Sequence, residues 1–218
     1  MDKLRLVYEQ TGRARWISHL DAMRTLQRGL LRAGVPIKYS EGFNPHALIS
    51  VVMPLSVGSE SLCQMADIRV REDVDLAPLP AKLSAVMPEG LRFTDAYEAF
   101  SKPAELKWLT VEGLWEYDAA DPEEAAAGCR ALFAGPVVVT RRTKRGEGPF
   151  TITDHVRELT FMPEAKGVRV RATVSAAEPV VNPDLLTAAA AQNRPGLKPD
   201  AAHFIRLALY KADGSPFR

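Results

Sequence analysis

A chain of 218 residues with 46% hydrophobic and 25% charged side chains can bury a real core, which excludes a disordered or low-complexity protein. Its formal net charge is only +1, so any attraction to nucleic acid must come from local basic patches. The two cysteines, Cys63 and Cys129, belong to no CxxC or Cys/His cluster, and we expect buried free thiols, no metal and no cofactor. The N-terminal residues lack the order of a signal peptide and no run of 18 apolar residues occurs, which predicts a cytoplasmic protein without a membrane segment.

The first half of the chain predicts the element order β-α-β-β-α-β. Residues 3–9 alternate polar and apolar, as a half-buried strand does. Ser18 and Asp21 resemble a capping box, and an apolar stripe then predicts a helix over about 19–33, which Gly34 and Pro36 end. The other predicted elements are strands at 37–39, 48–55 and 65–72, a weaker helix at 76–87 and a closing strand at 91–99.

The second half predicts the same order after a segment without periodicity at 101–105. Its strands are expected at 105–114, 136–143, 166–176 and 203–211, its helices at 121–135 and 182–192, and a short helical turn at 154–159. We therefore predict an α+β fold of tandem ferredoxin-like (split βαβ) modules with antiparallel sheets. The predicted domains are 1–102, which carries the distinctive motifs, and 103–218.

A basic stripe follows one flank of the first predicted helix. Arg24, Arg28 and Arg32 recur at a spacing of four residues, and Tyr39 and Phe43 follow soon after. Arginine forks bind phosphate oxygens and aromatic rings stack on bases, so this region is a candidate RNA-binding face. The alternative is a solvated helix flank in which Asp21 pairs with Arg24 or Arg28.

The loop SEGFNPHA and the start of the helix contribute two histidines, His19 and His46. Together they could act as an acid–base pair on RNA, although no spacing guarantees that they meet. Gly42 and the turn formers Asn44-Pro45 suit a loop with exposed amides that binds an anion, and they equally suit a plain connection between strands. We predict that His19 and this loop come together in space.

A second basic run, RRTKR at 141–145, stands where a predicted strand gives way to a glycine turn. It can contact phosphate. The alternative is a solubilising hairpin tip.

The first 70 residues contain a series of distinctive motifs. They are Ile17-Ser18-His19-Leu20-Asp21, Met23-Arg24, Arg32-Ala33-Gly34-Val35-Pro36, Tyr39-Ser40-Glu41-Gly42-Phe43-Asn44-Pro45-His46 and Met53-Pro54-Leu55-Ser56-Val57-Gly58. These motifs resemble the radical SAM-linked proteins, a bacterial domain family of unknown function found beside, or fused to, cobalamin-type radical SAM proteins. The resemblance implies an association with a radical SAM enzyme and no mechanism. The chain itself lacks the CxxxCxxC motif of such an enzyme, so any radical chemistry would belong to that partner.

Three functions are compatible with these patterns. The first is an RNA-binding accessory factor for tRNA or rRNA modification or processing, with a ligand-binding face made of His19, Arg24, Arg28, Tyr39, Phe43, Asn44 and His46. The second is a metal-independent endoribonuclease of the CRISPR repeat-processing type, with His19 and His46 as acid and base and Lys38 stabilising the phosphorane. The third is a protein–protein adaptor. The patterns favour binding over catalysis.

Overall fold

The computed structural model describes residues 3–143 and 146–218 and shows a mixed α+β fold with mostly antiparallel sheet and few helices. The chain divides into two compact units, Met1–Pro103 together with Arg218, and Ala104–Phe217. No helix within the described residues is long and apolar enough to cross a membrane.

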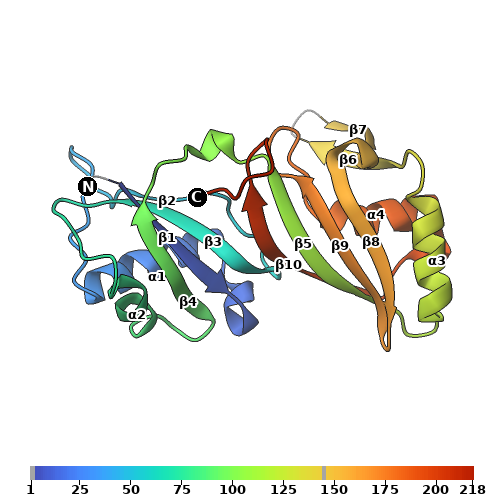
Figure 1. Cartoon of the computed structure of the whole chain (residues 1–218), viewed down its shortest axis with the longest axis horizontal. Coiled ribbons are helices and arrows are strands. Elements are labelled where there is room, and N and C mark those ends of the chain that lie inside the picture. Colours follow the sequence, from blue (N-terminus) through green and yellow to red (C-terminus); the bar gives the residue numbers. More distant parts are fainter. Residues whose placement is uncertain (1–2, 144–145) are drawn as a thin grey trace. The chain divides into compact units, whose positions relative to one another are not determined.

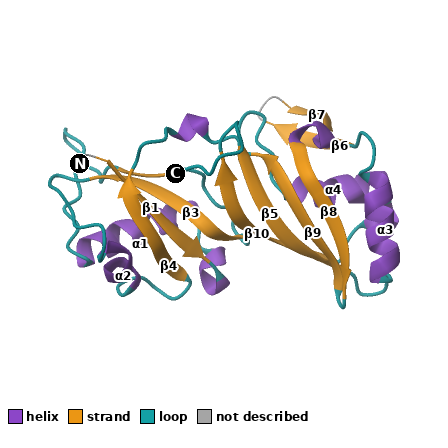
Figure 2. Cartoon of the chain, viewed as in Figure 1, coloured by secondary structure: helices purple, strands orange, loops and turns teal. Residues whose placement is uncertain are grey.

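The first unit has the predicted β-α-β-β-α-β order (Figures 1 and 2). The short strand expected at 37–39 is not formed, and this segment makes only isolated bridges, from Ile37 to Val70 and from Tyr39 to Ala47. Its strands pair in the order β4-β1-β3-β2, and every pair is antiparallel. The elements are β1 (Lys3–Gln10), the 3-10 turn η1 (Gly12–Trp16), α1 (His19–Arg32), β2 (Ile49–Val51), β3 (Glu60–Arg69), α2 (Leu79–Ser84) and β4 (Leu91–Glu98).

Alternation along β1 separates the two faces of this sheet. Leu4, Leu6 and Tyr8 are buried in one core cluster with leucines of both helices, among them Leu26 and Leu83. Each such buried side chain contributes about 1.5–3 kcal/mol relative to an exposed one. The residues between them in sequence point to the opposite face of the sheet, so Lys3 and Arg5 lie away from the helices.

The second unit differs from the predicted order (Figure 1). Its main strands pair in the order β10-β5-β9-β8, all antiparallel, and β6 and β7 form a separate two-stranded sheet. Helix α3 packs on β8 and β9, and α4 packs on β6 and on α3. The elements are β5 (Trp108–Glu116), α3 (Pro122–Leu132), β6 (Val138–Thr143), β7 (Gly146–Thr151), the 3-10 turn η3 (Ile152–His155), β8 (Val156–Glu164), β9 (Gly167–Ser175), α4 (Asp184–Asn193), the 3-10 turn η4 (Pro195–Leu197) and β10 (Ala201–Tyr210).

The short helical turn expected at 154–159 begins two residues earlier, as η3, and the rest of the segment belongs to strand β8, which was not expected. The strand predicted at 136–143 does not join the main sheet, since β6 pairs with β7 instead. Because the unit has two strands more than a simple β-α-β-β-α-β module, the tandem repeat is not confirmed in the form predicted.

Candidate functional site

The start of α1 is fixed by its predicted cap. The hydroxyl of Ser18 accepts a hydrogen bond from the Asp21 amide at 3.1 Å and donates one to the Asp21 carboxylate at 2.8 Å. The Ser18 hydrogen bond, with that of Arg24, lowers the pKa of the Asp21 carboxyl below its ordinary value. His19 is the first residue of the helix and is exposed.

The basic stripe of α1 is partly engaged in local contacts. Arg24 pairs with Asp21 at 3.2 Å, and both side chains are more than half exposed, so this pair contributes little stability. Arg32 donates to the Val86 carbonyl at 2.7 Å and so ties the end of α1 to the segment after α2. Arg28 is exposed between them. The stripe therefore combines a solvated flank with one structural contact.

The loop that carries Tyr39, Phe43, Asn44 and His46 is closed at its base. The Ser40 amide donates to the His46 carbonyl at 2.8 Å, the His46 amide donates to the Ser40 hydroxyl at 3.0 Å, and that hydroxyl lies 2.8 Å from His46 Nδ1. An isolated bridge joins Tyr39 to Ala47, so the neck of the loop resembles a short hairpin. These contacts leave the tip, with Phe43 and Asn44, exposed. The loop thus presents an aromatic ring to solvent on a constrained backbone.

The second anchor of the loop is β3. The Lys38 amide donates to the Arg69 carbonyl at 2.8 Å, and the Arg69 amide donates to the Leu48 carbonyl at 3.0 Å. The Lys38 side chain is exposed. The loop therefore begins and ends beside the last residues of β3.

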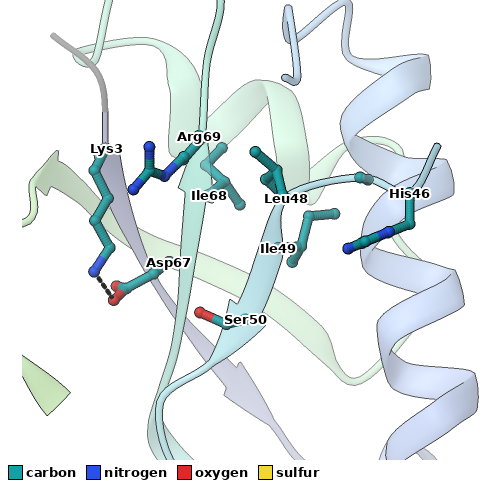
Figure 3. Close-up of a pocket in the computed structure, with 9 residues that line it drawn as sticks. Lys3, His46, Leu48, Ile49, Ser50, Asp67, Ile68 and Arg69 are labelled. Atoms are coloured by element: carbon teal, nitrogen blue, oxygen red, sulfur yellow. Dashed lines mark ion pairs between the residues drawn. The ribbon is translucent and has the colours of Figure 1, made fainter. Parts of the chain in front are cut away.

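A cavity of about 210 Å³ lies at this end of the sheet (Figure 3). Lys3 comes from β1, Asp67 and Arg69 come from β3, and Ser50 comes from β2, so three strands form its floor. In Figure 3 the Arg69 guanidinium and the Lys3 side chain lie on the same side of the cavity as Asp67. The full lining is Lys3, His46, Ala47, Leu48, Ile49, Ser50, Asp67, Ile68 and Arg69.

The Asp67 carboxylate is already bound by two cations. Arg5 donates to it from Nε at 2.7 Å and from Nη2 at 3.0 Å, and the Lys3 ammonium lies 2.8 Å away. Burial by itself raises the pKa of this carboxyl, but the hydrogen bonds from Arg5 and Lys3 outweigh it, and the pKa is lowered. Asp67 therefore stays ionised and holds the Lys3 ammonium at the wall of the cavity.

His19 and His46 line different cavities. His46 belongs to the one described above, at the Lys3–Arg69 end of the sheet. His19 lines a much smaller one with Gln10 and Gln64, at the other end of β1. The two imidazoles therefore do not line one cavity, as shared acid–base work would require.

The basic run at 141–145 is described only in part. Lys144 and Arg145 lie outside the described residues. The Arg141 guanidinium lies 4.9 Å from the centre of the Phe150 ring and donates to the Val180 carbonyl at 2.9 Å. His155 stacks on the same ring at 4.9 Å. Arg141 is thus used to hold the hairpin together.

Sequence reasoning missed Lys3, Arg5, Asp67 and Arg69. Their signal was the alternation in KLRL and ADIRV, which puts charged residues on one face of two strands. Only the antiparallel register, in which Arg5 faces Asp67 and Lys3 faces Arg69, makes them a cluster. In the described part of the chain, no group of three His, Cys, Asp or Glu side chains is placed to hold a metal ion.

Comparison with known proteins identifies a family and no activity. Residues 3–191 match the model of a family described as "Uncharacterized protein conserved in bacteria (DUF2344)". The comparison with curated proteins gives no match. Among solved structures, an unknown protein from Galdieria sulphuraria is similar at 9% identity over 94% of this chain and 98% of its own, with a TM-score of 0.24.

Proposed function

The chain belongs to the bacterial family DUF2344, and we propose that it is an RNA-binding accessory factor that acts in tRNA or rRNA modification or processing. One observation carries the proposal. The loop that closes at Ser40 and His46 exposes the ring of Phe43. His46 of the same loop lines a cavity together with Lys3 and Arg69. An aromatic platform and a cationic cavity thus belong to one loop and the strands that anchor it.

This combination suits single-stranded RNA. Unpaired bases stack on exposed aromatic rings, and the phosphates between them bind lysine and arginine. The Phe43 ring is fully exposed in the free protein and is therefore available to stack on a base. Tyr39 at the neck and Asn44 at the tip supply a second ring and a hydrogen-bonding amide beside it.

The ribonuclease alternative has less support, because His19 and His46 line different cavities. The side chain of Lys38 is exposed, and stabilising a phosphorane there would still require an acid and a base at the same site. In this proposal the loop residues His46, Tyr39, Phe43 and Asn44 bind RNA. His19, Arg24 and Arg28 of α1 complete the face.

A protein–protein adaptor is the second candidate, and a different observation favours it. Trp16, Leu20 and Val57 are each more than half exposed. The Gly58 backbone lies close to the Trp16 ring, where an added Cβ would be 3.3 Å from Cζ3. This apolar surface at the start of α1 would bind a polypeptide, and the radical SAM enzyme implied by the sequence resemblance is the partner we propose for it.

We also propose that the two units are tandem ferredoxin-like domains, 1–102 and 103–218. The strand orders β4-β1-β3-β2 and β10-β5-β9-β8 support this, since each places first and last strands side by side in an antiparallel sheet. In this proposal the β6–β7 hairpin is an insertion in the second domain.

The test is RNA binding by fluorescence anisotropy with a labelled single strand across a salt series. The logarithm of affinity should fall with the logarithm of salt by about 0.7 per phosphate contact, because each contact releases condensed counterions. Phe43→Ala should weaken binding about 5- to 100-fold, the effect of one lost stacked base. Replacing Arg24 and Arg28 with Ala should reduce the slope by about one per lost contact.

Phe100→Ala is the matched control, since Phe100 is a highly exposed phenylalanine of the same unit outside the loop. It should bind as the wild type does. Absence of binding at low salt, or equal loss in both phenylalanine variants, would reject the RNA-binding proposal and favour the adaptor.

A further inference from the structure

The tryptophan that ends η1 is exposed to solvent, and its neighbours hold it in place. The Trp16 ring is 58% exposed. The Gly58 backbone lies against it, since an added Cβ would be 3.3 Å from ring atom Cζ3, and the Gly58 amide donates to the Arg15 carbonyl at 2.8 Å. At the start of the same turn, the Gly12 amide donates to the Glu60 carboxylate at 2.6 Å. Because the turn is held at both ends, its tryptophan loses little conformational freedom when a partner covers it.

Two aliphatic side chains accompany this ring. Leu20 lies in the first turn of α1, four residues after Trp16, and Val57 directly precedes the glycine against which the ring packs. Each of the two is 59% exposed. We call Trp16, Leu20 and Val57 the Trp16 surface. Aliphatic side chains offer no ring on which a base can stack, so this surface suits the apolar side chains of a polypeptide better than it suits RNA.

Two arginines of the same turn have no carboxylate partner. Arg13 is exposed, and the Arg15 guanidinium lies 4.8 Å from the centre of the Trp16 ring. Within the described residues, neither guanidinium forms an ion pair or a side-chain hydrogen bond. A guanidinium presents a planar fork of N–H donors that matches the two oxygens of a carboxylate. The edge of the Trp16 surface therefore offers two cations to the acidic side chains of a partner.

The carboxylates of this region are used inside the unit. Asp21 pairs with Arg24 at 3.2 Å. Glu60 accepts the hydrogen bond from the first amide of η1 described above. In the described part of the chain, neither carboxylate pairs with Arg13 or Arg15. A partner whose charge complements this surface is therefore acidic.

We propose that the Trp16 surface binds an acidic segment of another polypeptide. Its apolar side chains cover Trp16 and Leu20, and its carboxylates pair with Arg13 and Arg15. Tryptophan and arginine are the residues that most often dominate the binding energy of protein interfaces, and both are present here beside each other. This inference rests on the protein–protein adaptor, the second candidate function above, and it names the chemistry of the adaptor's partner.

The test selects short peptides from a random displayed library on the full chain. The enriched sequences should combine acidic with apolar residues. A labelled synthetic peptide of the most enriched sequence then gives affinities by fluorescence anisotropy. Trp16→Ala should weaken its binding about 30-fold, the effect of losing one dominant interface residue.

A charge cycle tests the two arginines separately from the apolar surface. The double variant Arg13→Gln/Arg15→Gln should bind the acidic peptide about tenfold more weakly than the wild type does, because it loses the charge-assisted contacts. It should bind a form of the peptide with glutamine in place of each acidic residue as well as the wild type does. Arg71→Gln, at an exposed arginine beyond β3, is the matched control and should leave the affinity for the acidic peptide unchanged.

Two leucines of α1 provide a matched pair for the apolar contact. Leu20 is 59% and Leu31 is 51% exposed, and only Leu20 belongs to the Trp16 surface. Leu20→Ala should weaken binding of the peptide, while Leu31→Ala should bind it as the wild type does.

The outcomes separate the inference from the adaptor function. Enriched peptides without acidic residues, or equal loss in the two leucine variants, would overturn the inference and leave the adaptor candidate standing. If no peptide is enriched, both fail. Loss of binding to labelled single-stranded RNA in Trp16→Ala, as large as the loss for the peptide, would assign Trp16 to the RNA-binding face and would also overturn the inference.

Discussion

Arg5 and Asp67 form a two-point ion pair on the face of the first sheet opposite its helices, with both side chains almost fully buried. Arg5 Nη2, which donates to Asp67, also donates to the Ser101 carbonyl at 2.9 Å. The pair thereby links β1 and β3 to the segment that follows β4.

We expect Arg5→Ala or Asp67→Ala to lower the free energy of unfolding by about 3–5 kcal/mol, because each removes the two-point contact of a buried charge. The double variant Arg5→Met/Asp67→Leu should lose less than either single variant, since it removes both charges together. Urea denaturation measures all three. A double variant that loses as much as the sum of the single ones would show that the pair does not act as a unit.

The pH dependence of stability should reveal the same carboxylate. The folded pKa of Asp67 lies below that of an unfolded aspartate, about 3.9, so its ionised form stabilises the fold above about pH 4. That contribution is lost as the pH falls through the folded pKa. The difference in unfolding free energy between the wild type and Asp67→Asn should be constant from pH 7 to pH 5 and shrink below pH 4. A difference unchanged at pH 3 would contradict this assignment.

The sequence predicted best those elements whose ends are set by residues close together in the chain, such as a helix cap. The cap of α1 needs only Ser18 and the residues after it, and its expected end at 33 agrees with the observed His19–Arg32 to one residue. Strand β8 was missed because its alternation is broken. The pairing of β8 with β9 shifts register between Arg157 and Thr160, and Glu158 there has a φ of 53°, so side chains do not keep a period of two.

The cavity could not be predicted for a different reason. Lys3 and Arg69 are neighbours only through the antiparallel register of β1 and β3, which no local pattern contains. Phe43 and His46 were proposed as binding residues from the composition of their loop, and both are exposed in the structure. Residues such as Lys3 and Arg69 were therefore missed because they become neighbours only when the strands pair.

The two thiols should differ in reactivity. Both were expected to be buried, and Cys129 is, whereas Cys63 is only half-buried. Burial raises the pKa of the Cys129 thiol to about 11, although a hydrogen bond from Tyr117 acts in the opposite direction. A disulfide reagent at pH 8 should thus modify Cys63 first in the native protein and Cys129 only after unfolding, because the thiolate is the reactive form.

Cys63→Ser provides the control for this assignment. The native variant should show almost no labelling over the time in which the wild type takes up one equivalent. In denaturant it should take up one equivalent, from Cys129. Rapid labelling of the native variant would mean that α3 opens far more readily than its buried contacts indicate.

The β6–β7 hairpin should depend on two amide side chains at the end of α4. The hairpin has no partner strand among the main strands of its unit, so other contacts must hold it in place. The Gln192 side-chain oxygen accepts a hydrogen bond from the Thr140 amide at 2.8 Å, and the Asn193 side chain donates to the Val138 carbonyl at 2.8 Å. A two-stranded hairpin is marginal by itself in water.

Replacing Gln192 and Asn193 with Ala should therefore loosen the hairpin more than the rest of the unit. Each lost hydrogen bond costs about 0.5–1.5 kcal/mol, so amide exchange in β6 and β7 should become roughly 5- to 100-fold faster for the double variant. Exchange in β5 and β9 should change less, since those strands pair on both sides with others of the main sheet. Arg194→Ala, at the next and exposed residue, should leave the hairpin as it is. Equal acceleration in β5, β9 and the hairpin would mean that the amides stabilise the whole unit and do not anchor the hairpin specifically.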